Sequence, residues 1–202
     1  MKFLKDNSYD IVRLFINQIG ITIFAIVLYL PFGTFENAEL GFNLQTCVSI
    51  LSTIFYLVLL YNAGWEFGSK ARMRADSGKQ VLHRSTGAIM STVANLPNFI
   101  IAGLATVSIS LYMTHGNDAA YATFGVLNAF MRFLSSMYIG LLRGIFDFMA
   151  EEPVQYLFWQ TVGYLVLPLI SVLLTHAGYV IGSHHVKIST LIFGNKSQVN
   201  KK

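Results

Sequence analysis

Long runs without charged residues dominate the chain. Four stretches contain no Asp, Glu, Lys or Arg, and a fifth contains Arg132 alone; in chain order the five are Leu14 to Phe35, Leu40 to Trp65, Ser85 to Asn117, Ala119 to Leu142 and Pro153 to Val186. The hydrocarbon core of a bilayer is about 30 Å thick, which an α-helix crosses in roughly 20 apolar residues. The pattern therefore predicts about five transmembrane helices, within a range of four to six.

These runs favour helices over barrel strands. Backbone groups in hydrocarbon must be hydrogen-bonded internally, and barrel strands would alternate in hydrophobicity over about ten residues. We therefore expect an all-α, polytopic transmembrane bundle. It forms one membrane-embedded domain over residues 1–182, followed by a basic tail over 183–202. The predicted spans lie near 12–32, 44–65, 88–113, 120–142 and 156–182, and the polar segment 66–85 is read as a loop.

Composition excludes an ordinary soluble domain. Hydrophobic residues make up 54% of the chain and charged residues 12%, whereas a typical soluble domain carries about 25% charged residues. With so few charged residues, the chain has too little polar surface to cover a globule in water. The single cysteine, Cys47, separately excludes an intrachain disulfide.

The distribution of Lys and Arg predicts the orientation. Short basic loops stay cytoplasmic, so we expect a multi-pass protein of the cell membrane with a cytoplasmic N-terminus. Five crossings would, however, place the basic tail outside. Either a break near Pro168 or a re-entrant segment between Arg132 and Glu152 would remove this conflict. The basic residues between the second and third predicted spans are Lys70, Arg72, Arg74, Lys79 and Arg84.

Arg132 is the most informative polar position. A charge near the bilayer centre costs about 2.5 to 3.5 kcal/mol, so such a residue usually faces the bundle interior or water and finds a partner. Asn128, Arg132 and Ser135 are spaced i, i+4, i+7, which places them on one helical face. This stripe predicts a contact for an anion or polar solute, or a gating charge. The alternative is an arginine that pairs with Asp147 or Glu66 and fixes helix packing.

Two further polar groups interrupt the predicted spans. Asn17 and Gln18 lie early in the first span, where interhelical amide bonds are the simpler interpretation and a solute site the alternative. In the third span Asn95 and Asn98 flank Pro97, which removes a backbone donor and frees a carbonyl one turn earlier. Proline breaks often line cavities where loosened backbone contacts a solute. A kink repaired by the two amides explains the same residues.

Enzyme and nucleic-acid signatures are absent from the sequence. There is no phosphate-binding glycine loop, no H-E-x-x-H and no G-x-S-x-G, and one cysteine cannot build a thiolate metal site. We expect no enzyme activity, catalytic residue, metal or cofactor. The basic segment 70–84 fits contact with anionic lipid or with a protein partner, and orientation alone accounts for its charge without nucleic acid.

Several short phrases resemble small multi-pass membrane proteins of Gram-positive bacteria, a group without an assigned activity. The phrases are Asn17-Gln18-Ile19-Gly20, Trp65-Glu66-Phe67-Gly68, Asn95-Leu96-Pro97-Asn98 and Gly178-Tyr179 to Gly182. The resemblance implies a bacterial inner membrane and no mechanism.

The leading hypothesis is a transport-related function. The chain would be a small carrier, a channel or the membrane subunit of a transporter that handles a polar solute. The passage would be lined by Asn95, Asn98, Asn128 and Arg132. The alternative is a non-catalytic membrane partner or assembly subunit that docks another protein through residues 70–84. A homo-oligomer fits either hypothesis.

Overall fold

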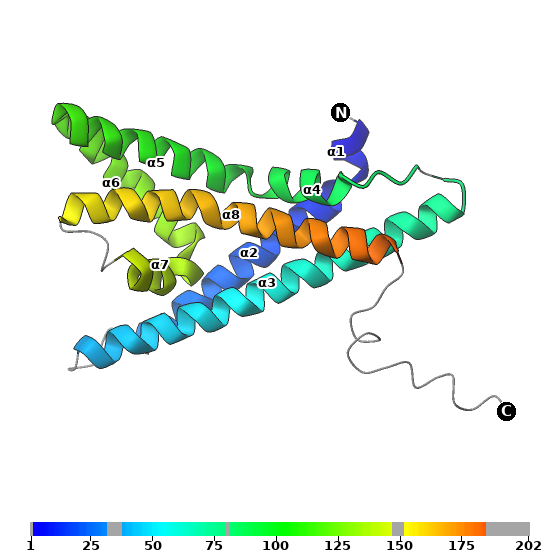
Figure 1. Ribbon diagram of the computed structural model, residues 1–202, viewed down its shortest axis with the longest axis horizontal. Helices are drawn as coiled ribbons and strands as arrows, with labels where there is room; N and C mark the ends of the chain where they lie inside the picture. Colours follow the sequence, from blue (N-terminus) through cyan, green and yellow to red (C-terminus); the bar gives the residue numbers. More distant parts are fainter. Residues whose placement is uncertain (1, 32–37, 80, 147–151, 185–202) are drawn as a thin grey trace.

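The computed structural model describes residues 2–31, 38–79, 81–146 and 152–184. Within these ranges the secondary structure is helical, which confirms the all-α prediction (Figure 1). The elements are α1 (Lys2–Asp6), α2 (Ser8–Tyr29), α3 (Ala38–Asp76), α4 (Thr86–Ala94), α5 (Leu96–His115), α6 (Asp118–Leu134), the short 3-10 turn η2 (Ser136–Tyr138), α7 (Ile139–Phe146) and α8 (Pro153–Ser183).

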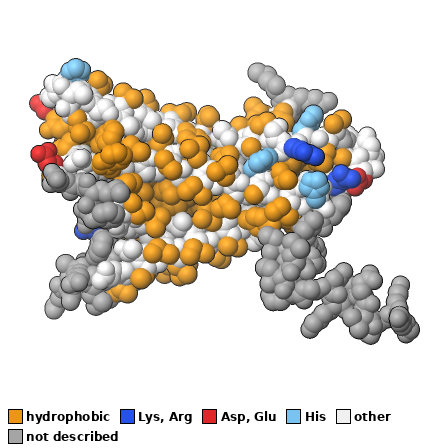
Figure 2. All heavy atoms as spheres, in the orientation of Figure 1, with side chains coloured by type: hydrophobic (Ala, Val, Ile, Leu, Met, Phe, Trp, Pro, Cys, Tyr) orange, Lys and Arg blue, Asp and Glu red, His pale blue; other side chains and the backbone are white. Residues whose placement is uncertain are grey.

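Four of the described helices are long and apolar enough to cross a bilayer: Ser8–Tyr29, Asn43–Asp76, Leu96–His115 and Pro153–Ser183. Apolar side chains cover the flank of the bundle, and the coloured charges gather toward its two ends (Figure 2). Large exposed apolar residues include Ile16, Val126 and Leu173, each more than half exposed. A surface of this kind is suited to lipid. The chain is a multi-pass integral membrane protein.

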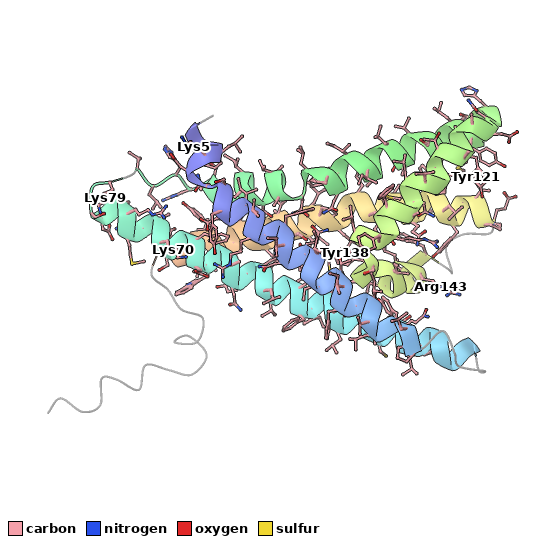
Figure 3. The ribbon with its side chains drawn as sticks, turned by 180° about the vertical axis from the view of Figure 1, so that it is seen from behind. Lys5, Lys70, Lys79, Tyr121, Tyr138 and Arg143 are labelled. Atoms are coloured by element: carbon pink, nitrogen blue, oxygen red, sulfur yellow. The ribbon has the colours of Figure 1, made fainter. Side chains whose placement is uncertain are left out.

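The bundle has two distinct ends. The N-terminus, the connection from α3 to α4 and the end of α8 share one end, here termed the basic end (Figure 1). The opposite end, here termed the far end, holds the close of α2, the start of α3, the connection from α5 to α6 and the start of α8. Among labelled residues, Lys5, Lys70 and Lys79 lie toward the basic end, and Tyr121 lies toward the far end (Figure 3).

The fourth predicted span, residues 120–142, does not form a straight crossing. The chain bends by 87° where α6 passes into η2 and α7. Figure 3 places Tyr138 in the middle of the bundle and Arg143 nearer the far end. The contacts agree, because Met137 meets Ser49 while Gly140 meets Gln45, closer to the start of α3. The segment α6–η2–α7 therefore enters and leaves at the far end as a re-entrant hairpin.

The hairpin bears on the conflict over the basic tail. Since residues 118–146 enter and leave at the far end, α2 starts at the same end of the bundle at which α8 finishes (Figure 1). The tail after residue 184 lies outside the described residues. The alternative, a break near Pro168, does not occur, because α8 runs without interruption from Pro153 to Ser183. The break expected at Pro97 does occur, between α4 and α5 at Asn95.

The prediction of a loop over residues 66–85 is wrong in its first half. Helix α3 is 39 residues long and ends only at Asp76. Two ion pairs at i, i+4 spacing support this extension, since Lys70 Nζ lies 2.6 Å from Glu66 and Arg72 Nε lies 3.0 Å from Asp76. The first three basic residues of the predicted loop, at positions 70, 72 and 74, are thus helical.

Helices α3 and α8 pack with their backbones in direct contact. A Cβ added to Gly64 would meet the carbonyl oxygen of Thr175, and one added to Gly182 would meet that of Trp65. Gly68 and Gly178 make the same kind of approach. Glycine at spacing i, i+4 allows helices to approach this closely in membranes. The pair α3–α8 is therefore the rigid centre against which the other helices pack.

Candidate functional site

The tip of the re-entrant hairpin is held by side chains from α2 and α3. The carbonyl of Leu134 accepts hydrogen bonds from Gln18 Nε2 at 3.2 Å and Thr22 Oγ1 at 2.9 Å. The carbonyl of Met137 accepts from Ser49 Oγ at 2.5 Å, with Thr53 Oγ1 at 3.4 Å. A bend frees carbonyls from the helical ladder, and in a membrane other protein groups must satisfy them. The hairpin can therefore end at mid-bundle depth.

The predicted residues Gln18, Asn95 and Asn98 meet in one network. Asn98 Nδ2 donates to Gln18 Oε1 at 2.8 Å and to Asn95 Oδ1 at 3.1 Å, and Asn95 Nδ2 donates to the Ser91 carbonyl at 2.9 Å. All three amide residues are buried. The bond between Asn98 and Gln18 ties α5 to α2 directly after the break at Asn95. Asn17 is half-buried and lies outside these bonds.

Arg132 reaches from α6 to α8. Its Nη2 donates to Gln160 Oε1 at 3.3 Å, and its side chain remains exposed. Of the two acidic partners considered from sequence, Glu66 instead pairs with Arg13 at 2.9 Å and with Lys70. The other, Asp147, lies outside the described residues.

Of the three residues predicted to share one helical face, only Asn128 and Arg132 lie within α6. Ser135 is the buried residue at which α6 ends, so it belongs to the bend and not to the helical face. The face of α6 is continued on α8 by Gln160 and Tyr164, which are 1% and 2% exposed. Tyr164 follows Gln160 one turn later on α8.

We use the name α6–α8 groove for a cluster of polar side chains on the two helices, defined by Asn128, Arg132, Gln160 and Tyr164. Helices α6 and α8 both pack on α5 but make no extensive contact with each other. Three buried polar atoms of the groove have no hydrogen-bond partner among the described residues: Asn128 Oδ1, Gln160 Nε2 and the Tyr164 hydroxyl. Buried polar atoms without a partner are costly.

A cavity lies toward the far end of the bundle, between the end of α5 and the starts of α6 and α8. Its volume is about 510 Å³, and it is lined by Tyr112, Met113, Gly116, Asp118, Glu152, Val154 and Gln155. Gln160 follows Gln155 on α8 by little more than one helical turn, about 7 to 8 Å at the α-helical rise. We term it the far-end cavity.

The basic residues lie at the basic end, as their predicted orientation requires. Arg74, Lys79 and Arg84 are exposed there. Arg74 and Lys70 also line a small cavity of about 20 Å³ together with Asp10. Three exposed cations at one end of a bundle can contact anionic headgroups or an acidic protein surface.

Sequence reasoning missed half of the α6–α8 groove. Gln160 is the only amide side chain within the predicted fifth span, and Tyr164 follows it at i, i+4. This spacing on an apolar helix is the signal that could have found both residues. The hydroxyl donors to the hairpin tip, Thr22, Ser49 and Thr53, carry no such signal because Ser and Thr commonly bond to their own helix.

The described residues hold no group of three or more His, Cys, Asp or Glu side chains placed to bind a metal ion. Comparison of the chain with protein-family models, curated proteins and solved structures finds no significant match.

Proposed function

We propose that the chain is a transport-related protein of the cell membrane, a small carrier or channel for a polar solute that uses the α6–α8 groove. The observation that carries this proposal is the re-entrant hairpin, whose bend lies at mid-bundle next to unpaired polar atoms. Irregular backbone at membrane depth occurs where it is buried in protein or lines a cavity, and transporters use broken helices at their solute sites.

The solute path would start in the far-end cavity and lead along the groove to Arg132 and Tyr164. Below that point Gln18 and Asn98 close the bundle interior with a direct hydrogen bond. The passage is thus narrow toward the basic end, and Asn95 and Asn98 act as a closed gate in place of the open lining predicted from sequence. Opening would require the hairpin tip to leave its side-chain donors.

The hydrogen bonds that hold the hairpin tip are individually weak. Interhelical hydrogen bonds in membranes average about 0.6 kcal/mol each. Bonds of this kind hold the carbonyls of Leu134 and Met137, and packing adds to them, because Met137 and Tyr138 are buried. By contrast, the glycine contacts between α3 and α8 leave no room for sliding. We therefore propose that the hairpin moves while the α3–α8 pair stays fixed.

The proposed orientation places the basic end in the cytoplasm. Short basic segments stay on that side, and each exposed Lys or Arg near anionic lipid gains about 1 kcal/mol. The far-end cavity would then open to the outside.

The test is solute uptake into proteoliposomes that contain the purified full chain. Radiolabelled amino acids, carboxylates, phosphate and sugars are supplied under an imposed gradient, with Arg132→Leu as the test variant and Lys5→Leu as the control. The proposal expects protein-dependent uptake of at least one solute, lost in Arg132→Leu and kept in the control. Uptake equal to that of empty liposomes for every solute would refute it.

A second candidate function, an assembly subunit that docks a protein through residues 70–84, is favoured by the exposed side chains of Arg74, Lys79 and Arg84. Native mass spectrometry of the gently extracted protein tests it. A stoichiometric partner that is lost when these three residues are changed to Gln supports docking. A lone monomer or symmetric homo-oligomer supports the carrier or channel.

A further inference from the structure

We infer that the α6–α8 groove binds an oxyanion, the carboxylate or phosphate group of its ligand, between Arg132, Gln160 and Tyr164. The inference rests on the proposed function in one respect, namely that the ligand is a transported solute. The binding site itself is derived from the side chains alone.

The orientation of the Gln160 amide is fixed by its partner. A guanidinium is only a donor, so the atom that Gln160 presents to Arg132 at 3.3 Å must be its oxygen. The Nε2 group then points elsewhere as a buried donor without a partner. One turn along α8, the Tyr164 hydroxyl is also buried and unpartnered. One neutral donor therefore lies beside the cation and a second lies one turn along α8, and both lack an acceptor.

Arg132 supplies the charge. One of its N–H groups is directed at Gln160, and a guanidinium has further N–H donors in a planar fork that matches the two oxygens of a carboxylate or phosphate. Asn128 lies one turn earlier on the same face of α6, and its amide can turn either its oxygen or its nitrogen toward a ligand. The two helices therefore meet at Arg132 and Gln160, with Asn128 one turn earlier on α6 and Tyr164 one turn later on α8.

The acidic residues of the far-end cavity do not oppose this assignment. Asp118 and Glu152 are exposed. Fourteen positions separate Asp118 from Arg132 on α6, about 21 Å at the helical rise of 1.5 Å per residue. The exposed charge of Asp118 is therefore largely screened at physiological salt, where the Debye length is about 8 Å. Glu152, at the N-cap of α8, precedes Gln160 by eight positions, about 12 Å, and is screened less.

The test measures binding directly and needs no flux. The detergent-purified full chain is titrated with sodium phosphate and with sodium succinate by calorimetry, with sodium chloride at equal ionic strength as the reference. We expect saturable binding of at least one of the two oxyanions. Its affinity falls at least tenfold in Arg132→Gln and severalfold in Gln160→Leu, and stays within twofold in Lys5→Gln. Equal affinity in Arg132→Gln and the parent chain overturns the inference.

Gln160→Glu separates loss of the site from loss of the fold. The new carboxylate lies where the Gln160 oxygen now accepts from Arg132, so the protein would supply its own oxyanion. We expect a higher thermal unfolding midpoint together with at least tenfold weaker binding. Asn117→Asp is the matched control, because it adds the same charge at the cap of α6, where Asp caps as well as Asn. A Gln160→Glu protein that binds as the parent does would overturn the inference.

The oxyanion can come from a soluble molecule or from a phospholipid headgroup. Native mass spectrometry of protein reconstituted with phosphatidylglycerol distinguishes the two sources. Retained lipid that requires Arg132 and survives phosphate assigns the site to a headgroup, and lipid displaced by phosphate or succinate assigns it to a solute. Absence of any Arg132-dependent oxyanion from either source overturns the inference.

The two proposals fail separately. Uptake of a neutral solute with no oxyanion binding refutes the oxyanion site and leaves the transport function standing. Oxyanion binding with no uptake of any solute refutes the transport function and leaves a ligand or lipid site between α6 and α8.

Discussion

The hydroxyl of Thr22 on α2 donates a hydrogen bond of 2.9 Å to the carbonyl of Leu134, across 112 positions of the sequence. Leu134 is the last residue of α6, directly before the bend. The bond thus joins a straight transmembrane helix to the turning point of the re-entrant hairpin. It is a contact that no local pattern in either segment encodes.

Removing both side-chain donors to the Leu134 carbonyl should lower the free energy of unfolding by more than the sum of the two single losses. Thr22→Val removes one donor and leaves Gln18 on the same carbonyl, so we expect a loss of about 0.6 kcal/mol in the free energy of unfolding. Gln18→Leu together with Thr22→Val leaves the Leu134 carbonyl without a side-chain donor. We expect this to lower the free energy of unfolding by a further amount of about 1 to 3 kcal/mol. Unfolding in mixed micelles measures both.

Thr106→Val is the control for this pair, because the Thr106 hydroxyl donates only to the Ala102 carbonyl of its own helix. It should change the free energy of unfolding little. If the double variant costs no more than the sum of its two single substitutions, the tip is not held as described.

The close approach of α3 and α8 predicts a strong effect of one methyl group. In Gly64→Ala the new Cβ falls on the Thr175 carbonyl oxygen, a backbone atom that cannot move aside alone. We expect a loss of about 1 to 3 kcal/mol in the free energy of unfolding, as for other overpacked cores. Thermal or detergent-induced unfolding checks the value.

Gly103→Ala on α5 is the matched substitution, because nothing lies within 4 Å of a Cβ added there. Alanine is the better helix former by about 0.5 to 1 kcal/mol, so this variant should be as stable as the parent or more stable. Equal losses in the two variants would show that helix propensity, and not the α3–α8 contact, controls the result.

The number of crossings predicts which loops share a side of the membrane. In a chain with Cys47 replaced by Ser, single cysteines at Asn117 and Glu152 should react with an impermeant maleimide from one side, because both flank the re-entrant hairpin. A cysteine at Lys79 should react from the other side. Reaction of Asn117→Cys and Glu152→Cys from opposite sides would mean that residues 118–146 cross the bilayer once.

Four of the five predicted spans correspond to helices long and apolar enough to cross a bilayer, because charge-free runs of this length have few alternatives. The fourth, 120–142, is bent by 87°. The break at Asn95 was also predictable, since Pro97 cannot donate to the helical ladder. The extension of α3 to Asp76 was missed because a charged segment fits a loop as well as a helix. Only the i, i+4 pairs, Glu66 with Lys70 and Arg72 with Asp76, favoured the helix.

The bend at Ser135 could not be predicted, because neither Pro nor Gly stands there to cause it. It exists because Gln18, Thr22 and Ser49 satisfy the carbonyls that it frees. Two of the four site residues could therefore be predicted from the sequence, because Asn128 and Arg132 are polar residues in an apolar run. Gln160 and Tyr164 could not be assigned to the same site from the sequence, because they lie on α8, far from α6 along the chain.

The most direct measurement of the central claim, that the α6–α8 groove is a polar site open to water from the far end, is cysteine labelling at Asn128. In the chain with Cys47 replaced by Ser, the control is a cysteine at Phe130, which lies on the same helix and is 57% exposed on the apolar flank. We predict that a charged, impermeant thiosulfonate modifies Asn128→Cys from the far-end side and leaves Phe130→Cys unmodified. Equal reaction at the two positions, or none at Asn128, would contradict the claim.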